Sequence, residues 1–119
     1  MTISRHRFDI TTDTGGDFVD TGPPCMGAVL QILSSLGNTD TGCDIRLETV
    51  QSGLVIADYD NIGAALRSAA PRILTFDTGG AAVGDQPPVV EGDRLRLTIT
   101  QSEGVVGAKT ATVWVWTGW

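Results

Sequence analysis

Residues 94–100 read RLRLTIT, an alternation of polar and apolar side chains without a fault. In an extended strand, successive side chains point to opposite faces, so this segment is expected to have one buried and one solvent-facing side. Residues 110–116, TATVWVW, alternate in the same way. The turn-rich QSEG at 101–104 lies between them. The sequence therefore predicts two half-buried strands joined as a hairpin.

Length and composition extend this reading to the whole chain. The 119 residues include 15 glycines and five prolines, which suit many short strands better than a few long helices. A chain of this length buries roughly two thirds of its unfolded surface. We expect one domain, residues 1–119, with an all-β fold. The predicted architecture is a two-sheet antiparallel β-sandwich of jelly-roll or Greek-key type, with seven or eight short strands and at most one short helix.

Further segments can be placed by their patterns. An N-terminal strand or arm is expected over 1–12, followed by an acidic loop over 13–24. Residues 43–50 and 54–57 predict a hairpin around Gln51-Ser52-Gly53, and 72–77 predict another strand. The glycine-rich and proline-rich stretch after it, up to Pro88, reads as a loop.

Two segments have helical features. Apolar residues in 27–36 recur at helical spacing before Gly37, although the same run also suits a strand buried on both faces. Pattern alone slightly favours the helix. Asn61 could cap a short helix that continues to Ala69 and ends at Pro71.

The charge of the chain argues against several classes of partner. The net charge is −6, and basic residues form only two close pairs, Arg5/Arg7 and Arg94/Arg96. A nucleic-acid binder needs basic clusters, so no direct nucleic-acid readout is expected. No stretch approaches the roughly 20 apolar residues that span a bilayer, so no membrane association is expected. The N-terminus does not have the pattern of a signal peptide, which predicts a protein made and used without export.

The tripeptide Asp-Thr-Gly occurs at Asp13, Asp20, Asp40 and Asp77. In dimeric aspartic proteases this motif supplies one carboxylate of a shared pair, and Asp77 is the best candidate because an apolar segment leads into it. The same tripeptide is also a turn unit, since aspartate bonds its own backbone and glycine adopts positive φ. The turn is the favoured interpretation, and no catalytic residue is assigned.

Other reactive side chains form no recognisable constellation. Cys25 and Cys43 lack metal-ligand spacing, and free, buried thiols are expected for a chain in a reducing compartment, although pairing is not excluded. His6 is the one histidine, and a strand-surface or interface position is expected for it. The aspartates match no EF-hand loop. No metal, cofactor or enzymatic activity is therefore predicted.

The C-terminal tryptophans are the strongest candidates for a binding surface. Trp114 and Trp116 fall on the strand face opposite Val113 and Val115, and Trp119 follows just beyond. Aromatic side chains are enriched at the centres of protein interfaces. The alternative is a central strand covered on both sides. We predict contact surfaces at Trp114, Trp116 and Trp119 and at the N-terminal residues Arg5, Arg7 and Phe8.

From residue 27 onward, the chain resembles small virion proteins of tailed bacteriophages. The matching pieces, in order, are 42–49 (GCDIRLET), Ser52-Gly53, Asn61, Pro71-Arg72, 92–97 (GDRLRL) and 108–113 (AKTATV). The resemblance implies a β-sandwich that works by association, and it favours a strand for 27–36. Loop 13–24 and the Trp-rich end depart from the group.

On this resemblance, the function expected is that of a capsid decoration or cement protein, which stabilises the head shell by protein–protein contacts. Its partners would be the major capsid protein and further copies of itself, and its location the virion, assembled in the host bacterial cytoplasm. A head-to-tail connector or tail ring component is the alternative. A dimeric aspartic protease and a carbohydrate-binding sandwich are the other rivals.

Overall fold

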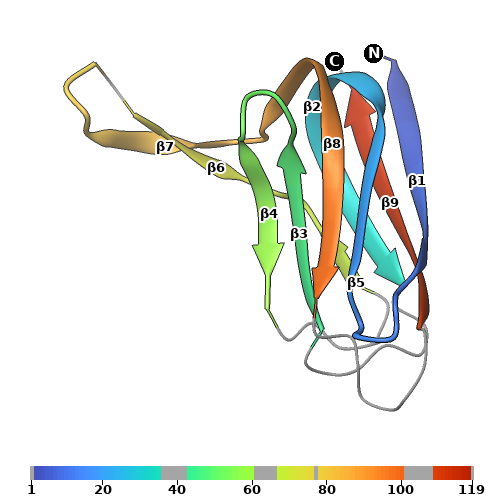
Figure 1. The fold of residues 1–119 in the computed structure, drawn as a ribbon. Coiled ribbons are helices and arrows are strands. Elements are labelled where there is room, and N and C mark those ends of the chain that lie inside the picture. Colours follow the sequence, from blue (N-terminus) through green and yellow to red (C-terminus); the bar gives the residue numbers. More distant parts are fainter. Residues whose placement is uncertain (1, 36–42, 61–66, 77, 101–108, 119) are drawn as a thin grey trace.

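The computed structural model describes residues 2–35, 43–60, 67–76, 78–100 and 109–118, which contain nine β-strands and no helix (Figure 1). The strands are β1 (Ile3–Thr11), β2 (Phe18–Ser35), β3 (Asp44–Thr49), β4 (Val55–Tyr59), β5 (Arg67–Ala69), β6 (Ile73–Phe76), β7 (Ala82–Gln86), β8 (Val89–Thr100) and β9 (Thr110–Gly118). All pairings are antiparallel. The all-β sandwich predicted from the sequence is confirmed.

Strand β2 belongs to both layers of the sandwich. Its first part pairs with β8, from Phe18 opposite Ile99 to Ala28 opposite Val89. Its second part pairs with β9, from Ala28 opposite Gly118 to Ser35 opposite Thr112. The first layer therefore consists of β1, β9 and the second part of β2, with β5 at its edge. The second layer consists of the first part of β2 with β8, β3 and β4.

The change of layer takes place at Gly27. Its φ of 111° is a backbone conformation that residues with a Cβ rarely adopt. A Cβ built at this position would lie 2.8 Å from the carbonyl oxygen of Gly118. Glycine therefore allows both the bend in β2, visible at the top of Figure 1, and the close approach of β9.

The hydrophobic core lies between the two layers. Alternation along each strand turns one face inward, and burial of these apolar side chains is the main stabilising contribution. The inward residues of the first layer include Phe8, Ile10, Val29, Ile32, Val113 and Val115. Those of the second layer include Ile45, Leu47, Ile56, Leu95, Leu97 and Ile99.

The predicted C-terminal hairpin is wrong, although both of its strands are confirmed. Strand β8 pairs with β2 and β3, whereas β9 pairs with β1 and β2, so the two strands lie in different layers. Sequence alternation fixes which face of a strand is buried, but two half-buried strands can equally well face each other across a core. The predicted hairpin of β3 and β4 is confirmed.

Four local predictions need correction. Residues 27–35 form a strand, as the resemblance to phage virion proteins predicted, so the helix favoured by the spacing of apolar residues is wrong. Pairing with β9 outweighs a weak helical pattern. The expected loop 13–24 becomes strand at Phe18, and the glycine-rich stretch after 78 contains β7. Of the helix proposed from Asn61, residues 61–66 lie outside the described residues, and Arg67–Ala69 is a strand that pairs with β2.

Strands β6 and β7 form a separate two-stranded sheet. This hairpin, here called the arm (residues 73–86), projects away from the sandwich on the side of β4 (Figure 1). The side of the sandwich that carries β1 lies at the opposite end of the same view.

Candidate interaction surface

The outer face of the first layer carries an aromatic strip. Antiparallel register places Arg5, Trp116 and Gln31 in one row across β1, β9 and β2. The next row contains Arg7, Trp114 and Leu33 in the same order. Both tryptophans and Leu33 are partly exposed, while their neighbours Val113 and Val115 point inward and are fully buried. The alternation predicted for β9 is thus confirmed.

Basic and apolar side chains border this strip. The guanidinium carbon of Arg7 lies 5.9 Å from the centre of the Trp114 ring, within the range of a cation–π contact. Arg7 also donates a hydrogen bond of 2.8 Å to Asp9. At the other end, Leu30 and Ile3 converge over Gly118, where a Cβ would meet their side chains at 3.1 and 3.3 Å. Ile3 is 57% exposed.

We call this surface the aromatic face. It consists of Ile3, Arg5, Arg7, Leu30, Gln31, Leu33, Trp114 and Trp116. The pairing of β1 with β9 places four of the six predicted contact residues on the aromatic face, namely Arg5, Arg7, Trp114 and Trp116. The β2 residues of this face could not be predicted, because no local pattern identifies β2 as the neighbour of β9.

The two remaining predicted residues do not belong to the described part of the aromatic face. Phe8 is 3% exposed and points into the core, since it falls on the inward side of β1 between Arg7 and Asp9. Its ring packs beneath Gly22, where a Cβ would lie 3.4 Å from the ring. Phe8 is therefore a core residue of the chain, not a surface contact. Trp119 lies outside the described residues.

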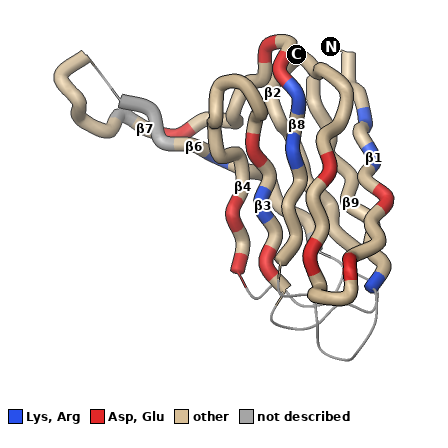
Figure 2. Tube along the Cα trace, in the orientation of Figure 1, with Lys and Arg blue, Asp and Glu red and all other residues tan. Residues whose placement is uncertain are grey.

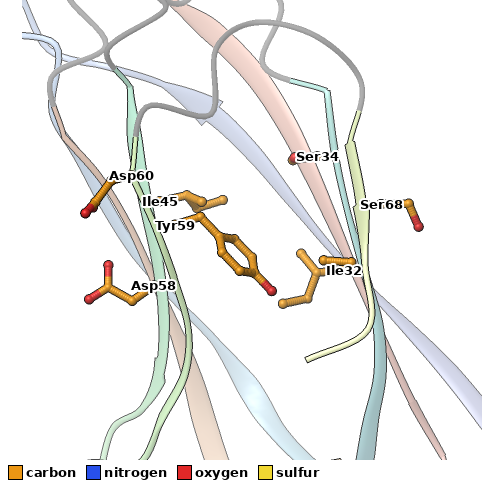
Figure 3. A pocket seen from close by; sticks show the side chains of 8 residues that line it. Ile32, Ser34, Ile45, Asp58, Tyr59, Asp60 and Ser68 are labelled. Atoms are coloured by element: carbon orange, nitrogen blue, oxygen red, sulfur yellow. The ribbon is translucent and has the colours of Figure 1, made fainter. Parts of the chain in front are cut away.

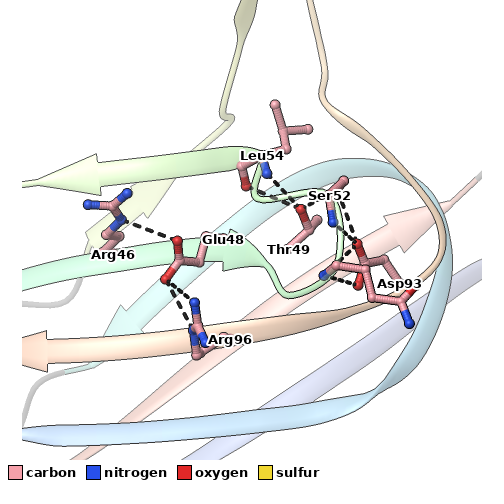
Figure 4. Close-up of polar contacts among 8 residues, drawn as sticks. Arg46, Glu48, Thr49, Ser52, Leu54, Asp93 and Arg96 are labelled. Carbon is pink, nitrogen blue, oxygen red and sulfur yellow. Dashed lines mark hydrogen bonds and ion pairs between the residues drawn. The ribbon is translucent and has the colours of Figure 1, made fainter.

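The outer face of the second layer is different in kind. Glu48 accepts hydrogen bonds from Nε and Nη2 of Arg96 at 3.1 and 3.0 Å, and its other oxygen lies 3.6 Å from Arg46 (Figure 4). The Glu48 side chain is 15% exposed. Its charge is therefore matched by arginines on β3 itself and on β8.

Asp93 holds the β3–β4 turn against β8. Its carboxylate accepts backbone N–H bonds from Gln51, Ser52 and Arg94, at 2.7 to 3.2 Å, and a 3.1 Å bond from the Ser52 hydroxyl (Figure 4). These donors, first those of Gln51 and Ser52, lower the pKa of Asp93 to about 2. A carboxylate whose oxygens are engaged in this way is a structural clamp.

A groove of about 450 Å³ lies between the layers, on the side of the sandwich where β4 and β5 are the edge strands (Figure 3). The Tyr59 ring points into it toward Ile32, whereas the neighbouring Asp58 and Asp60, which also line the groove, project to the other side of the chain. Burial raises the pKa of Tyr59. The described lining also includes Ser34 and Ser68.

The other predicted chemical groups occupy structural positions. Asp13 accepts N–H bonds from Gly15 and Asp17, at 2.9 and 3.0 Å, as expected of a turn aspartate. Asp20, in contrast, lies inside β2, so the turn reading is wrong there. Asp40 and Asp77 lie outside the described residues. His6 faces the interior side of β1, with Nε2 3.2 Å from the Thr117 hydroxyl, and burial lowers its pKa.

Cys25 and Cys43 are buried and not bonded to each other. Burial raises the pKa of Cys25 and the nearby charge of Asp93 adds to this, which makes a reactive thiolate unfavourable. Within the described ranges, no group of three or more histidine, cysteine or acidic side chains is arranged to hold a metal. No helix in that part of the chain is long and apolar enough to cross a membrane.

Charged residues are distributed along the strands, with acidic residues outnumbering basic ones (Figure 2). In the described strands, the basic residues lie on β1, β3, β5 and β8.

Comparison with known proteins gives similar folds only. No protein-family model and no curated protein matches the chain. Among solved structures, FLHE is 13% identical over 98% of both chains with a TM-score of 0.40. A cyanophage Pam1 capsid chain is 15% identical over 97% of this chain and 81% of its own, with a TM-score of 0.48. A chain of infectious bursal disease virus, Gx strain, is 11% identical over 95% and 32%, with a TM-score of 0.33. Such distant similarity does not identify a function.

Proposed function

We propose that this protein is a structural component of a tailed-phage particle and stabilises the head shell as a decoration or cement protein. The observation that carries the proposal is the aromatic face. It presents two partly exposed tryptophans beside two arginines on the outer surface of a sheet. The sequence resemblance to small phage virion proteins supports the same role.

The composition of the aromatic face suits protein–protein contact. Tryptophan and arginine are the residue types most enriched among those that dominate binding energy, and they act best when surrounded by residues that exclude water. Leu30, Leu33 and Ile3 provide apolar surroundings along the strip. A protein that binds only the assembled shell stabilises that shell by mass action, and many copies add their contributions.

The proposed mechanism is association without catalysis. Each copy would bury its aromatic face against the major capsid protein after the shell has formed. No residue is assigned a catalytic role, and this includes Asp77, the residue suggested by the protease motif. A peptidase assay at acidic pH, with an Asp77→Asn variant as control, tests this: activity lost in the variant would contradict it.

The first test is the number of copies in the particle. Quantitative mass spectrometry of purified virions should find hundreds of copies, in a fixed ratio to the major capsid protein. Six or twelve copies would instead assign the chain to a head-to-tail connector or tail ring. Absence from the particle would reject the virion role altogether.

The second test concerns the surface used. Trp114→Ala and Trp116→Ala should each weaken binding to shells lacking the protein by about 30-fold, corresponding to about 2 kcal/mol for a central aromatic contact. Thr98→Ala is the matched control, because Thr98 is a partly exposed residue on the outer face of the other layer. Equal losses from the tryptophan variants and the control would contradict the proposed surface. Thermal unfolding confirms that each variant is folded.

A further inference from the structure

The arm is a strand pair without neighbours in the part of the chain that is described. Strands β6 and β7 pair with each other from Ile73 opposite Gln86 to Phe76 opposite Ala82, and with no other strand there. An isolated two-stranded hairpin is at best marginally stable in water. Its open edges also present backbone N–H and C=O groups that readily add to another strand.

The root of the arm is fixed to the sandwich. Pro71 and Pro88, on either side of the arm, are buried. The N–H of Val29 in β2 donates a 2.8 Å hydrogen bond to the carbonyl oxygen of Pro88. Between the two prolines, Arg72 donates to Asp85 at 2.8 and 3.0 Å. The arm therefore leaves the body in a defined direction, as a built element of the fold.

Among the open sheet edges of the described residues, β1 suits an added strand best. It is a nine-residue strand in continuous register with β9, and its other edge pairs with no strand there. The first part of β2 has Pro23 and Pro24 and register shifts beside them, which interrupt the row of donors. Strand β4 has only five residues and β5 only three.

Charge selects the same edge. Residues 73–86 contain two aspartates and no lysine or arginine, but Asp85 is paired with Arg72, so residues 72–86 have a net charge of −1. Strand β1 carries two exposed arginines and Asp9, which is paired with Arg7, so its net charge is +1. Strand β4 presents Asp58, with Asp60 directly after it. An acidic arm is attracted to the first edge and repelled by the second.

The arm and β1 lie on opposite sides of the sandwich (Figure 1), so a contact between them requires two molecules. We infer that the arm of one copy adds as a strand to the β1 edge of a second copy of this chain. This inference goes beyond the proposed function, because it concerns the contact between copies and not the contact with the shell. Each copy has one arm and one β1 edge, so the contact is head-to-tail and propagates into a ring or a chain.

The test uses two variants that each lose one side of the contact. The shortened-arm variant replaces residues 75–84 with Asn-Gly, a two-residue turn that joins Leu74 to Asp85 and keeps the Arg72 contact. The acidic-edge variant carries Arg5→Glu and Arg7→Glu. Arg94→Glu is the control, an exposed arginine on the other layer. Analytical ultracentrifugation measures the mass of each protein up to about 100 µM, well above a micromolar Kd.

The full-length protein and the Arg94→Glu control should exceed the monomer mass of 12.5 kDa, and each of the two variants should be monomeric. A 1:1 mixture of the variants should form a heterodimer and stop there, since the intact arm of one still fits the intact edge of the other. A monomeric full-length protein, unchanged assembly of either variant, or a mixture that stays monomeric would overturn the inference.

A charge exchange covers the case in which the shortened arm does not fold. Thr78→Lys, Ala81→Lys, Ala82→Lys and Gln86→Lys, all at exposed positions of the arm, change the net charge of residues 73–86 from −2 to +2 and should abolish self-association. Mixing this protein with the acidic-edge variant should restore assembly, because opposite charges then meet at every contact; failure to restore it counts against the inference. Since no shell is present, these results are independent of whether the protein binds capsids.

Discussion

The two outer faces of the sandwich are both built from antiparallel strands, but they differ in the side chains they expose. On the β8–β3 face, Glu48 is engaged by Arg96 and Arg46, so charge is satisfied within the chain. On the β9–β1 face, Trp114 and Trp116 remain partly exposed, and Arg5 and Arg7 stand at their border. A face whose polar groups are already paired has little to offer a partner. A face with exposed aromatic rings gains from being covered.

The difference indicates a division of roles between the two layers. Changes on the β8–β3 face should affect the stability of the isolated chain. Changes on the aromatic face should affect association and leave the fold nearly intact. Strand β2 joins the layers, so a change at its bend should affect both.

The largest effect is expected at that bend. Gly27→Ala places a Cβ 2.8 Å from a backbone oxygen at a φ of 111°, and neither the β2 bend nor β9 can move without losing pairing. We expect a loss of at least about 3 kcal/mol in the free energy of unfolding, measured by urea denaturation.

The matched control for the bend is Gly53→Ala. Gly53 also has a positive φ, 69°, but a Cβ there would have no atom within 4 Å. This variant should lose only about 1 kcal/mol, from backbone strain alone. Similar losses at both glycines would show that the close approach of β9 to β2 is unimportant.

A pH-dependent effect is expected at the Asp93 clamp. The pKa of Asp93 is lowered to about 2 in the folded protein, below the usual value near 3.9, so its contribution to stability is full above about pH 4. That contribution is lost as the pH falls from about 4 through 2. In Asp93→Asn, the thermal midpoint should be lower at pH 7, and the decrease between pH 4 and 2 should be smaller than in the unchanged protein. Parallel pH profiles of the two proteins would contradict the clamp.

Much of the fold could be predicted from local pattern. The alternation in β8 and β9 gave both strands and their buried faces correctly, because burial on one face selects period two. Their pairing could not be predicted. The bend at Gly27 inserts β2 between the two strands, and that depends on contacts between residues far apart in the sequence.

The aromatic face shows the same limit at the level of the site. Trp114 and Trp116 were predicted from β9 alone, and Arg5 and Arg7 from the N-terminal strand. The contact predicted at Phe8 is wrong, because Phe8 follows His6 by two residues and therefore falls on the same inward side of β1. Leu33 could be assigned only once the register between β2 and β9 was known.

The smallest effect compares one charged residue from each face. Glu48→Gln weakens charge-assisted bonds to a side chain that is mostly buried, and should lower the free energy of unfolding by about 1 kcal/mol. Arg7→Ala removes an ion pair to Asp9 whose side chains are 56% and 71% exposed, and should cost less than about 0.5 kcal/mol.

The same Arg7→Ala protein should nevertheless bind shells lacking the protein more weakly, because Arg7 borders Trp114 on the face proposed to be covered. Urea denaturation of the two variants and their co-sedimentation with such shells, measured side by side, separate the roles of the faces. If Arg7→Ala lowers stability as much as Glu48→Gln and leaves binding to shells unchanged, the aromatic face is part of the chain's own stabilisation. The division between the layers would then be rejected. If Arg7→Ala instead weakens binding and leaves stability nearly unchanged, Arg7 makes a contact that the isolated chain does not contain.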